Sequence, residues 1–287
     1  MLRSKQKWLF YGLYTAAVVI FFLYYLFPSK AVEAYIVSAV QRVRPGAAVS
    51  IGRISPAFPP GIRASAVSLS DSEALEVSLD HIRITPQLRT LFGSAERVLT
   101  FQGRGYDGSI TGRMALDRQR SLQRLHADFS DLQIGRMAPV QHLSGRSVSG
   151  RISGTIDVEG GDPDLRMTAT LAASDVRIGL DIPGVPVKEL TFSEANARLT
   201  AANAANLRME SLTAKGRQVN GNMAGAIRLV SPYPRSILDL AGAVRPHPSF
   251  ISELGSSLAV LFRSRGGNNT FPFVVKGTIE SPEFLLR

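Results

Sequence analysis

One short segment of the chain matches a motif that binds phosphate. Residues 103–108 read Gly-Arg-Gly-Tyr-Asp-Gly and fit the G-x-G-x-x-G pattern of dinucleotide sites. In such a site a strand precedes the glycines and a helix follows them, so that the helix N-terminus faces the pyrophosphate. Here residues 109–114 alternate polar and apolar side chains, which is typical of a strand. We therefore interpret Asp107-Gly108 as the turn of a β-hairpin and expect no dinucleotide site.

The titratable residues do not form a recognisable catalytic or metal-binding motif. The histidines lack the H-E-x-x-H or paired spacing of metal ligands, and no G-x-S-x-G or phosphate-binding P-loop motif occurs. The acidic residues around Gly160-Gly161 lack the ligand spacing of a calcium loop and indicate a solvated turn between strands. We expect no enzyme, and no catalytic residue, metal ligand or cofactor. The residues weighed are His81, His126, His142 and His247, the pair Asp128 and Asp131, and Asp157, Glu159, Asp162 and Asp164.

Composition excludes further classes of function. The 287 residues contain no cysteine, which excludes thiol catalysis, disulfides and cysteine zinc sites. The formal net charge of +10 comes mostly from arginines scattered along the chain, without a dense basic run. Nucleic acid is therefore not an expected partner. A basic domain beside a membrane could instead meet anionic headgroups, although dispersed arginines also suit a solvated strand face.

Three segments repeat one pattern, in which apolar residues and glycines alternate with polar residues. A period of two indicates strands that are buried on one face, and such strands are usually antiparallel. The glycines could bend the sheet, or they could leave room for a ligand on an apolar groove. As an alternative, the apolar face could close into a core. The candidate groove residues are Gly150, Ile152, Gly154, Ile156, Gly221, Met223, Gly225, Ile227, Phe273, Val275 and Gly277.

Most of the remaining chain has the same character. Short alternating segments separated by turn residues run from Val49 onward, which is typical of an all-β architecture. Residues 248–263 place apolar side chains at helical spacing and predict a helix that packs over an edge or an open end of the sheet. The sequence thus predicts a mainly β fold, with one large antiparallel sheet and one or two accessory helices.

The N-terminus predicts a membrane anchor. Residues 8–27 contain no charge, and 20 residues of helix span about the 30 Å of a bilayer core. Arg3, Lys5 and Lys7 precede this stretch, which favours a cytoplasmic N-terminus. A signal peptide cleaved near Ala31 is the alternative. We expect three parts: the basic N-terminus and anchor (1–30), an amphipathic connecting helix (31–47) and an exported β-rich domain (48–287).

The order of these features resembles a known family. The sequence joins a basic N-terminus, one anchor that ends at Phe27-Pro28, glycine-ladder strands and a terminal Phe-Val-Val-Lys-Gly-Thr-Ile segment over residues 273–279. Segments 58–62 and 231–236, rich in proline, fit the same order. Over nearly the whole chain this pattern resembles the long form of type II secretion system protein N. The glycine ladders and the C-terminal pattern also resemble the wider AsmA-like group.

The resemblance implies a function without catalysis. It implies a component of the type II secretion system in the bacterial inner membrane, with the N-terminus in the cytoplasm and the bulk of the chain in the periplasm. Such a protein would act through contacts with other envelope subunits of the secretion system. The AsmA-like group implies a bent antiparallel sheet, and the alternative that an apolar groove binds or transfers lipid, either phospholipid or lipopolysaccharide. No family motif specifies a binding residue.

Overall fold

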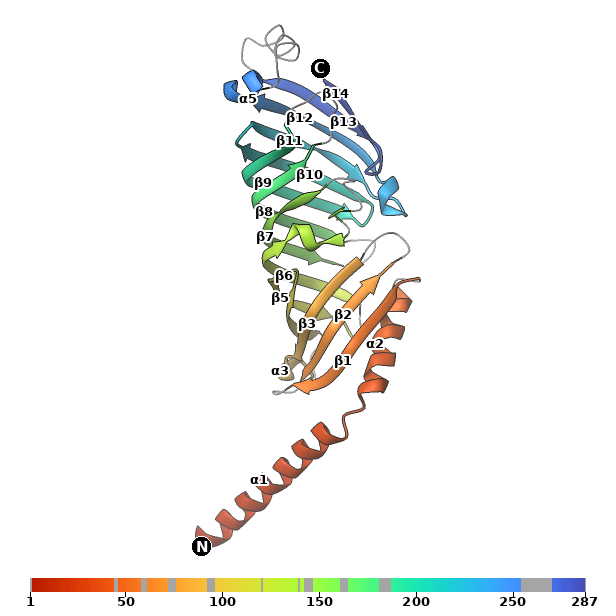
Figure 1. Ribbon diagram of the computed structural model, residues 1–287. Helices are drawn as coiled ribbons and strands as arrows, with labels where there is room; N and C mark the ends of the chain where they lie inside the picture. The colour runs from red at the N-terminus through yellow and green to blue at the C-terminus, as the bar shows by residue number, and fades with distance from the viewer. Residues whose placement is uncertain are drawn as a thin grey trace.

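The protein is built around one antiparallel β-sheet. The computed structural model describes residues 2–43, 46–57, 61–71, 76–91, 96–119, 121–138, 140–141, 147–160, 165–180, 187–253 and 270–286. Fourteen strands hydrogen-bond in the order in which they occur in the chain, and the sheet twists along its length (Figure 1). Every pair is antiparallel, so each strand needs only a turn or a loop to reach the next. The prediction of a mainly β fold with one large antiparallel sheet is confirmed.

The helices are few and, apart from the first two, short. The helical elements are α1 Leu2–Tyr25, α2 Ser29–Val43, α3 Leu88–Leu91, α5 Pro248–Glu253 and the 3-10 turns η1 Ile134–Arg136 and η2 Tyr233–Arg235. The predicted helix over 248–263 begins at Pro248 as expected, and its continuation from 254 lies outside the described residues. The strands are β1 Ala48–Ala57, β2 Gly61–Ser70, β3 Glu76–Pro86, β4 Arg97–Gly105, β5 Gly108–Leu116, β6 Leu122–Gln133, β7 Val148–Glu159, β8 Arg166–Gly179, β9 Glu189–Asn203, β10 Asn206–Gly216, β11 Val219–Arg228, β12 Ile237–Pro246, β13 Phe271–Gly277 and β14 Pro282–Leu286.

The G-x-G-x-x-G segment is the tip of the β4–β5 hairpin. Gly105 pairs with Gly108, and the two residues between them, Tyr106 and Asp107, have φ angles of 53° and 59°. Positive φ at both central residues is the geometry of the two-residue turn that matches the twist of paired strands. No helix follows the glycines, because residues 108–116 form β5. The hairpin prediction is confirmed.

Two rows of apolar residues cross all fourteen strands on one face of the sheet. Residues directly opposite one another on neighbouring strands share a face, so the pairing register defines each row. We call this surface the apolar face. The first row is Pro56, Ile62, Ile84, Phe101, Gly112, Ala127, Ile156, Ala169, Leu199, Met209, Gly225, Leu240, Val275 and Phe284. The second is Ile54, Ala64, Ile82, Gly103, Ile110, Phe129, Gly154, Leu171, Ala197, Leu212, Met223, Gly242, Phe273 and Leu286.

β-Bulges keep other apolar residues on the same face. In β6 the register shifts between Phe129 and Leu132, and Asp131 takes a φ angle of 56°. The backbone N–H of Asp131 donates to the hydroxyl of Ser153 at 2.9 Å, which satisfies a group that the ladder leaves out. In β8 the extra residue is Asp175, with φ 53°. A residue added to one strand reverses the parity of everything after it, so Leu132 rejoins the apolar face only because of the bulge.

Helix α2 covers the N-terminal end of the apolar face. Ile51, Ile54 and Ala64 are buried there, and Phe27, Val32 and Ile36 pack against them, together with partly buried residues of β1 to β3. The predicted connecting helix over 31–47 is therefore present as Ser29–Val43, and it lies against the sheet. It covers the first strands of the sheet.

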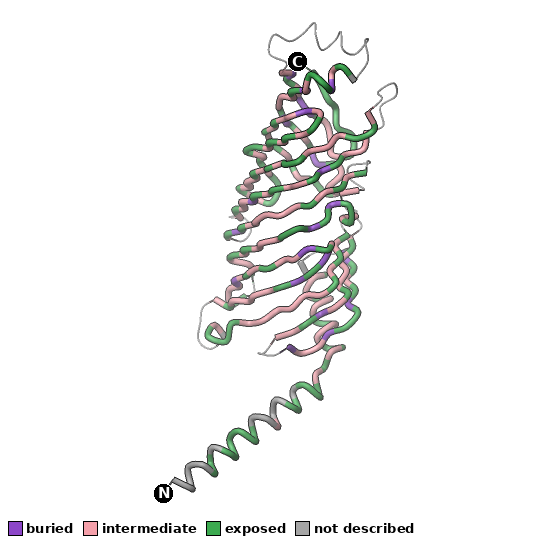
Figure 2. The backbone as a smooth tube through the Cα atoms, turned by 60° about the vertical axis from the view of Figure 1, so that its left-hand side comes forward, coloured by how far each residue is buried: buried purple, intermediate pink, exposed green. Residues whose placement is uncertain are grey.

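Helix α1 extends away from the sheet (Figure 2). Among the residues that the structure describes, no helix is both long and apolar enough to cross a membrane. The side chains of Leu9, Ala16, Ala17, Val19, Ile20 and Leu23 lie outside the described part of the chain. The helix expected over 8–27 is thus present, while the expectation that it spans a membrane has no support from the described residues.

The sheet is a single layer over most of its length. The chain exposes 18943 Å² of surface, whereas a compact monomer of its mass of 31.0 kDa exposes about 12,000 Å². Most described residues are exposed or half-buried, and buried ones are scattered along the strands (Figure 2). Two hydrophobic clusters join helices to the apolar face: α2 packs on the first strands, and α5 packs on β9, β11 and β12. Most residues of the two apolar rows are half-buried, whereas Ala169, Leu240 and Val275 are 3%, 5% and 4% exposed.

Candidate functional site

The apolar face deepens into a groove toward the C-terminal end of the sheet. The groove has a volume of about 630 Å³ and is lined by side chains from β8 to β14. Leu240, Val275 and Phe284 of the first row and Met223 and Phe273 of the second row form its floor. Among its lining residues only Asn222 has a polar side chain. Such a surface can bind an apolar ligand and offers almost nothing to a polar one.

Four of the eleven expected groove residues line this groove: Gly221, Met223, Phe273 and Val275. Gly225 and Ile227 line a different hollow, of about 710 Å³, which also includes Arg208, Arg228 and Asp239. Gly154 and Ile156 lie in the two apolar rows farther toward the N-terminus, beside Ile152 on the same face. Gly150 stands next to the bulge at Asp175, and Gly277 closes the turn from β13 to β14 with φ 89°.

Phenylalanine rings lie over four glycines of the apolar face. The directly opposed pairs are Phe101 with Gly112, Phe129 with Gly154, Phe192 with Gly216 and Phe273 with Gly242. A Cβ built on Gly154 or Gly242 would lie 3.0 Å or 2.9 Å from the Cζ atom of the opposite ring. The ring occupies the space that a side chain would otherwise fill. This is a known way to pin the register of a sheet across a glycine.

This arrangement corrects the idea that all the repeated glycines leave room for a ligand. A Cβ on Gly154 would collide with the carbonyl oxygen of Thr170. Gly225 has a φ angle of 150°, and a Cβ there would come within 2.7 Å of the Cα of Leu240. Only at Gly221 is the space open, since the nearest atom is the Ala243 carbonyl oxygen at 3.7 Å. Of these three glycines, Gly221 alone widens the groove.

Helix α5 packs against residues that also line the groove. Phe250 of this helix and Val219 at the start of β11 are both buried, and Leu190, Phe192 and Val244 pack against them. The backbone N–H of Ile251 bonds to the carbonyl of His247, and His247 Nε2 lies 3.2 Å from the carbonyl oxygen of Gly216. The described part of the helix, Pro248–Glu253, is therefore held to the strand ends, which agrees with the predicted position over an open end of the sheet and not with one over an edge strand.

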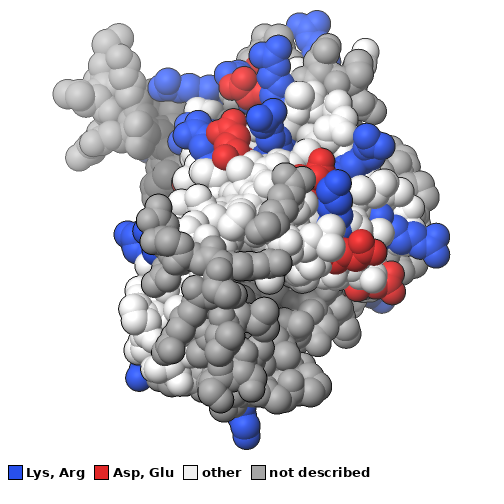
Figure 3. All heavy atoms as spheres, turned by 90° about the horizontal axis from the view of Figure 1, so that it is seen from above, with Lys and Arg blue, Asp and Glu red and all other residues white. Residues whose placement is uncertain are grey.

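The opposite face of the sheet is charged and solvated. Basic and acidic side chains alternate there and form ion pairs between neighbouring strands, such as Arg198 with Glu210 at 3.0 Å and Arg151 with Asp175 at 2.5 Å. Figure 3 shows charged side chains of both signs interleaved on one side of the molecule, beside a broad area of uncharged residues. Dispersed arginines therefore have a structural explanation as members of a solvated strand face.

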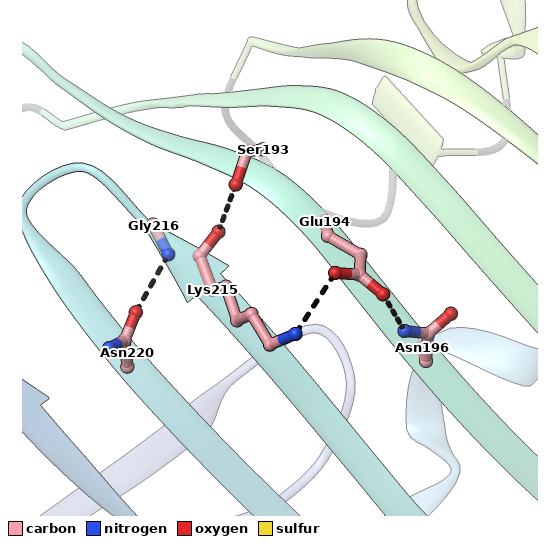
Figure 4. Close-up of polar contacts among 6 residues, drawn as sticks. All are labelled: Ser193, Glu194, Asn196, Lys215, Gly216 and Asn220. Carbon is pink, nitrogen blue, oxygen red and sulfur yellow. Dashed lines mark hydrogen bonds and ion pairs between the residues drawn. The ribbon is translucent and has the colours of Figure 1, made fainter.

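A polar network on β9 to β11 is typical of this face (Figure 4). Lys215 Nζ lies 3.2 Å from Glu194 Oε2, and the amide of Asn196 donates to Glu194 Oε1 at 2.7 Å. The hydrogen bonds from Asn196 and then Lys215 lower the pKa of Glu194 below its usual range. The side chain of Asn220 accepts a hydrogen bond from the N–H of Gly216 at 3.0 Å. These contacts hold strands together and bind nothing else in the described residues.

His126 is the centre of a second polar cluster, which the sequence motifs did not reveal. Its Nδ1 lies 2.6 Å from Asp157 Oδ1, and its Nε2 lies 3.1 Å from Asp128 Oδ2. The hydrogen bond that the ring donates to the Asp157 carboxylate raises the pKa of His126 above its ordinary value. Both ring nitrogens are engaged by carboxylates, so the imidazole is not free to accept a proton from a third group.

The local sequence predicts that Asp128 lies beside His126 in this cluster. Asp128 follows His126 by two residues on one strand, so the period of two places them on one face. Asp157 is opposite His126 only because β6 and β7 pair in this register, which the sequence alone does not fix. Among the described residues no group of three or more histidine, aspartate or glutamate side chains could hold a metal ion. His142 lies outside the described residues.

Comparison of the chain with protein-family models, with curated proteins and with solved structures finds no match.

Proposed function

We propose that this protein binds the acyl chains of lipids along the open apolar face of its sheet. One observation carries the proposal: two rows of apolar residues run without interruption through all fourteen strands, and most of their length is uncovered by any described element. Exposed apolar surface costs free energy in water, about 25 cal/mol for each Å². A ligand that covers it recovers that free energy.

The chemistry of the face suits an acyl chain. Hydrocarbon needs no hydrogen-bond partner, and the groove offers the single polar side chain of Asn222. In the described residues no buried side-chain nitrogen or oxygen lacks a hydrogen bond, so no buried polar side chain there needs a ligand as its hydrogen-bond partner. The proposal accordingly assigns no catalytic role and no cofactor.

The length of the sheet favours the binding of several acyl chains over the binding of one. Fourteen strands at a spacing of about 4.8 Å extend about 60 Å, twice the roughly 30 Å of a bilayer core. An acyl chain from one leaflet therefore covers only a fraction of the face. Phospholipid and the acyl chains of lipopolysaccharide both meet this requirement.

We further propose that α1 tethers the domain to the bacterial inner membrane, with the sheet in the periplasm. The support is the uncharged stretch over residues 8–27, preceded by Arg3, Lys5 and Lys7. Trp8, Tyr11, Tyr24 and Tyr25 lie near its ends, where amphipathic rings favour the membrane interface. This topology would place the end of the sheet that α2 covers next to the lipids of the inner membrane.

A role in type II secretion is the second candidate. Its support is the resemblance of the sequence to protein N of that system, together with an antiparallel sheet of the kind that the resemblance implies. In this case the sheet would contact other envelope subunits, and deletion of the gene would abolish secretion of type II substrates while leaving lipid content of the outer membrane unchanged.

Lipid content of the purified protein tests the main proposal. The full chain is extracted in mild detergent, and bound lipid is measured by mass spectrometry for the wild type, for Gly221→Phe and for Ala224→Phe. Gly221 has room for a side chain in the groove, whereas Ala224 is exposed on the opposite face of the same strand. We expect at least a threefold loss of lipid for Gly221→Phe only. A wild type without stoichiometric lipid would reject the proposal.

A further inference from the structure

The charged face of the sheet is not uniform along its length. From β6 to β10 neighbouring strands place charges of opposite sign against each other, as in His126 opposite Asp157 and Glu194 opposite Lys215. In β1 to β5 the pairing register instead defines three polar rows on this face, and none of their described members is acidic. Asp80 of β3 belongs to none of these rows. The rows are Arg53, Ser65, His81, Arg104 and Ser109; Ser55, Arg63, Arg83, Gln102 and Thr111; and Thr85, Thr100 and Arg113.

Five arginines and one histidine of these rows form a surface that we call the basic surface. Arg63 lies directly opposite Arg83, and like charges in this position destabilise a sheet. Most of the arginines are exposed and form no ion pair with a described residue, so the fold itself does not neutralise them. These exposed arginines are Arg53, Arg63, Arg104 and Arg113. The basic surface consists of these four residues, His81 and Arg83.

The basic surface suits a partner that carries phosphate groups. Five strands at a spacing of about 4.8 Å span about 20 Å, so neighbouring cations lie within the Debye length of about 10 Å. A guanidinium group binds a phosphate through two parallel hydrogen bonds. Clusters of about four to eight arginines or lysines next to a membrane are typical of binding to anionic lipid headgroups. The three rows contain no phenylalanine, tyrosine or tryptophan on which a nucleic-acid base can stack.

The place of the basic surface in the chain favours a membrane as this partner. Helix α1 leads through α2 directly into β1, so the strands of the basic surface follow closely after α1 (Figure 1). Helix α2 packs on the apolar side of these strands, against Ile51, Ile54 and Ala64, and not on the side of the arginines. Residues 26–28 belong to neither helix. This break gives α1 and the sheet a joint at which the sheet can tilt toward the membrane.

We propose that the basic surface binds the anionic headgroups of the membrane in which α1 is anchored. The contact holds the N-terminal strands of the sheet at the headgroup layer. This inference rests on the proposed membrane anchor, but it does not depend on lipid binding in the groove.

The test uses the full chain, which contains no cysteine, in vesicles of phosphatidylcholine with and without phosphatidylglycerol. Gln102→Cys places a fluorescent label among the arginines, at an exposed position opposite Arg83. Thr213→Cys places the same label at an exposed position of β10 on the same face of the sheet. A lipid with a quencher on its headgroup reports contact between the label and the membrane surface.

We expect the Gln102→Cys label to be quenched at least threefold more strongly in vesicles with phosphatidylglycerol, and the Thr213→Cys label to be unaffected. High salt should remove the difference, because it screens exposed charges. The double variant Arg63→Gln with Arg104→Gln should also reduce the quenching at least threefold. The matched control removes two charges from β7 and β9, in Arg151→Gln with Arg198→Gln, and should leave the quenching unchanged.

Quenching that is equal in both kinds of vesicle, or that the Arg63 and Arg104 substitutions do not reduce, would overturn the inference. The absence of quenching in anionic vesicles would overturn it as well, and would leave an acidic protein as the partner of this surface. Sedimentation with pure phosphatidylcholine vesicles reports on α1 separately. A chain that sediments with them, but shows no dependence on phosphatidylglycerol, keeps the anchor and rejects only the headgroup contact.

Discussion

At the scale of single residues, glycine and phenylalanine act as a pair on the apolar face. Glycine in a strand weakens it because it provides no side chain to pack. Here the opposite ring fills the gap at Gly112, Gly154, Gly216 and Gly242. The apolar face is therefore continuous at these positions, and the rings leave no hollow above the glycines. Gly221 has no such ring within contact distance, and it is the glycine that lines the groove.

Alanine substitutions should separate these two kinds of glycine. In Gly154→Ala the added methyl group meets the Thr170 carbonyl and the Phe129 ring, so we expect a loss of about 1–3 kcal/mol in the free energy of unfolding. Gly221→Ala should change it by less than about 0.5 kcal/mol, as the site is open. Denaturant unfolding followed by circular dichroism measures both values. Equal effects would show that the ring does not fill the site.

The His126 cluster predicts a small dependence of stability on pH. Because the pKa of His126 is raised in the folded protein, its protonated ring stabilises the fold. That contribution is fully present below the ordinary pKa of 6.5 and is lost as the pH rises through the folded value. The side chain is 51% exposed, so the effect should stay below about 1 kcal/mol. We expect His126→Gln to destabilise the protein more at pH 5.5 than at pH 9. A difference that does not vary with pH would contradict the assignment.

At the scale of elements, helix α2 gives the sheet its only two-layer region among the described residues near the N-terminus. Val32 and Ile36 face the buried residues of β1 and β2, whereas Ala34 is exposed on the other side of the helix. The helix thereby covers residues of both apolar rows, including Ile54 and Ile62. Whatever binds along the face must begin beyond it.

Aspartate substitutions test this packing. Ile36→Asp places a carboxylate against the apolar face, and we expect it to lower the free energy of unfolding by about 2 kcal/mol or more. The matched variant Ala34→Asp adds the same charge on the exposed side and should be nearly neutral. Thermal unfolding and the rate of proteolysis within residues 29–43 provide the measurements. If both variants behave alike, α2 does not pack on the sheet in solution.

Much of the element scale follows from the sequence. The alternating glycine segments predict β7, β11 and β13, the Asp107-Gly108 turn predicts the β4–β5 hairpin, and the helical spacing after Pro28 predicts α2. The bulges at Asp131 and Asp175 could not be predicted from the sequence, because each depends on the register in which its strand pairs with the next one. The positions of the phenylalanine rings over the glycines could not be predicted for the same reason. Of the eleven expected groove residues, seven lie in β11 and β13, and four of these seven line the groove.

At the scale of the whole molecule, a closed core and an open groove are the two arrangements that the sequence allows for the apolar face. The alternation of apolar and polar residues fits both arrangements, because it does not indicate whether a second layer covers the apolar side of a strand. The surface of 18943 Å² far exceeds the roughly 12,000 Å² of a compact chain of this mass. Helix α1, which extends away from the sheet, contributes to this surface, and the apolar face carries a groove of about 630 Å³ at its C-terminal end.

A phospholipid with a photoactivatable group in its acyl chain tests the central claim most directly. The labelled lipid is incorporated into membranes that contain the full chain, irradiated, and the modified residues are mapped by mass spectrometry. The account predicts labels on residues of the two apolar rows from β4 to β14, such as Met209, Leu240 and Val275. Labels on residues of the charged face, or on α1 alone, would contradict it.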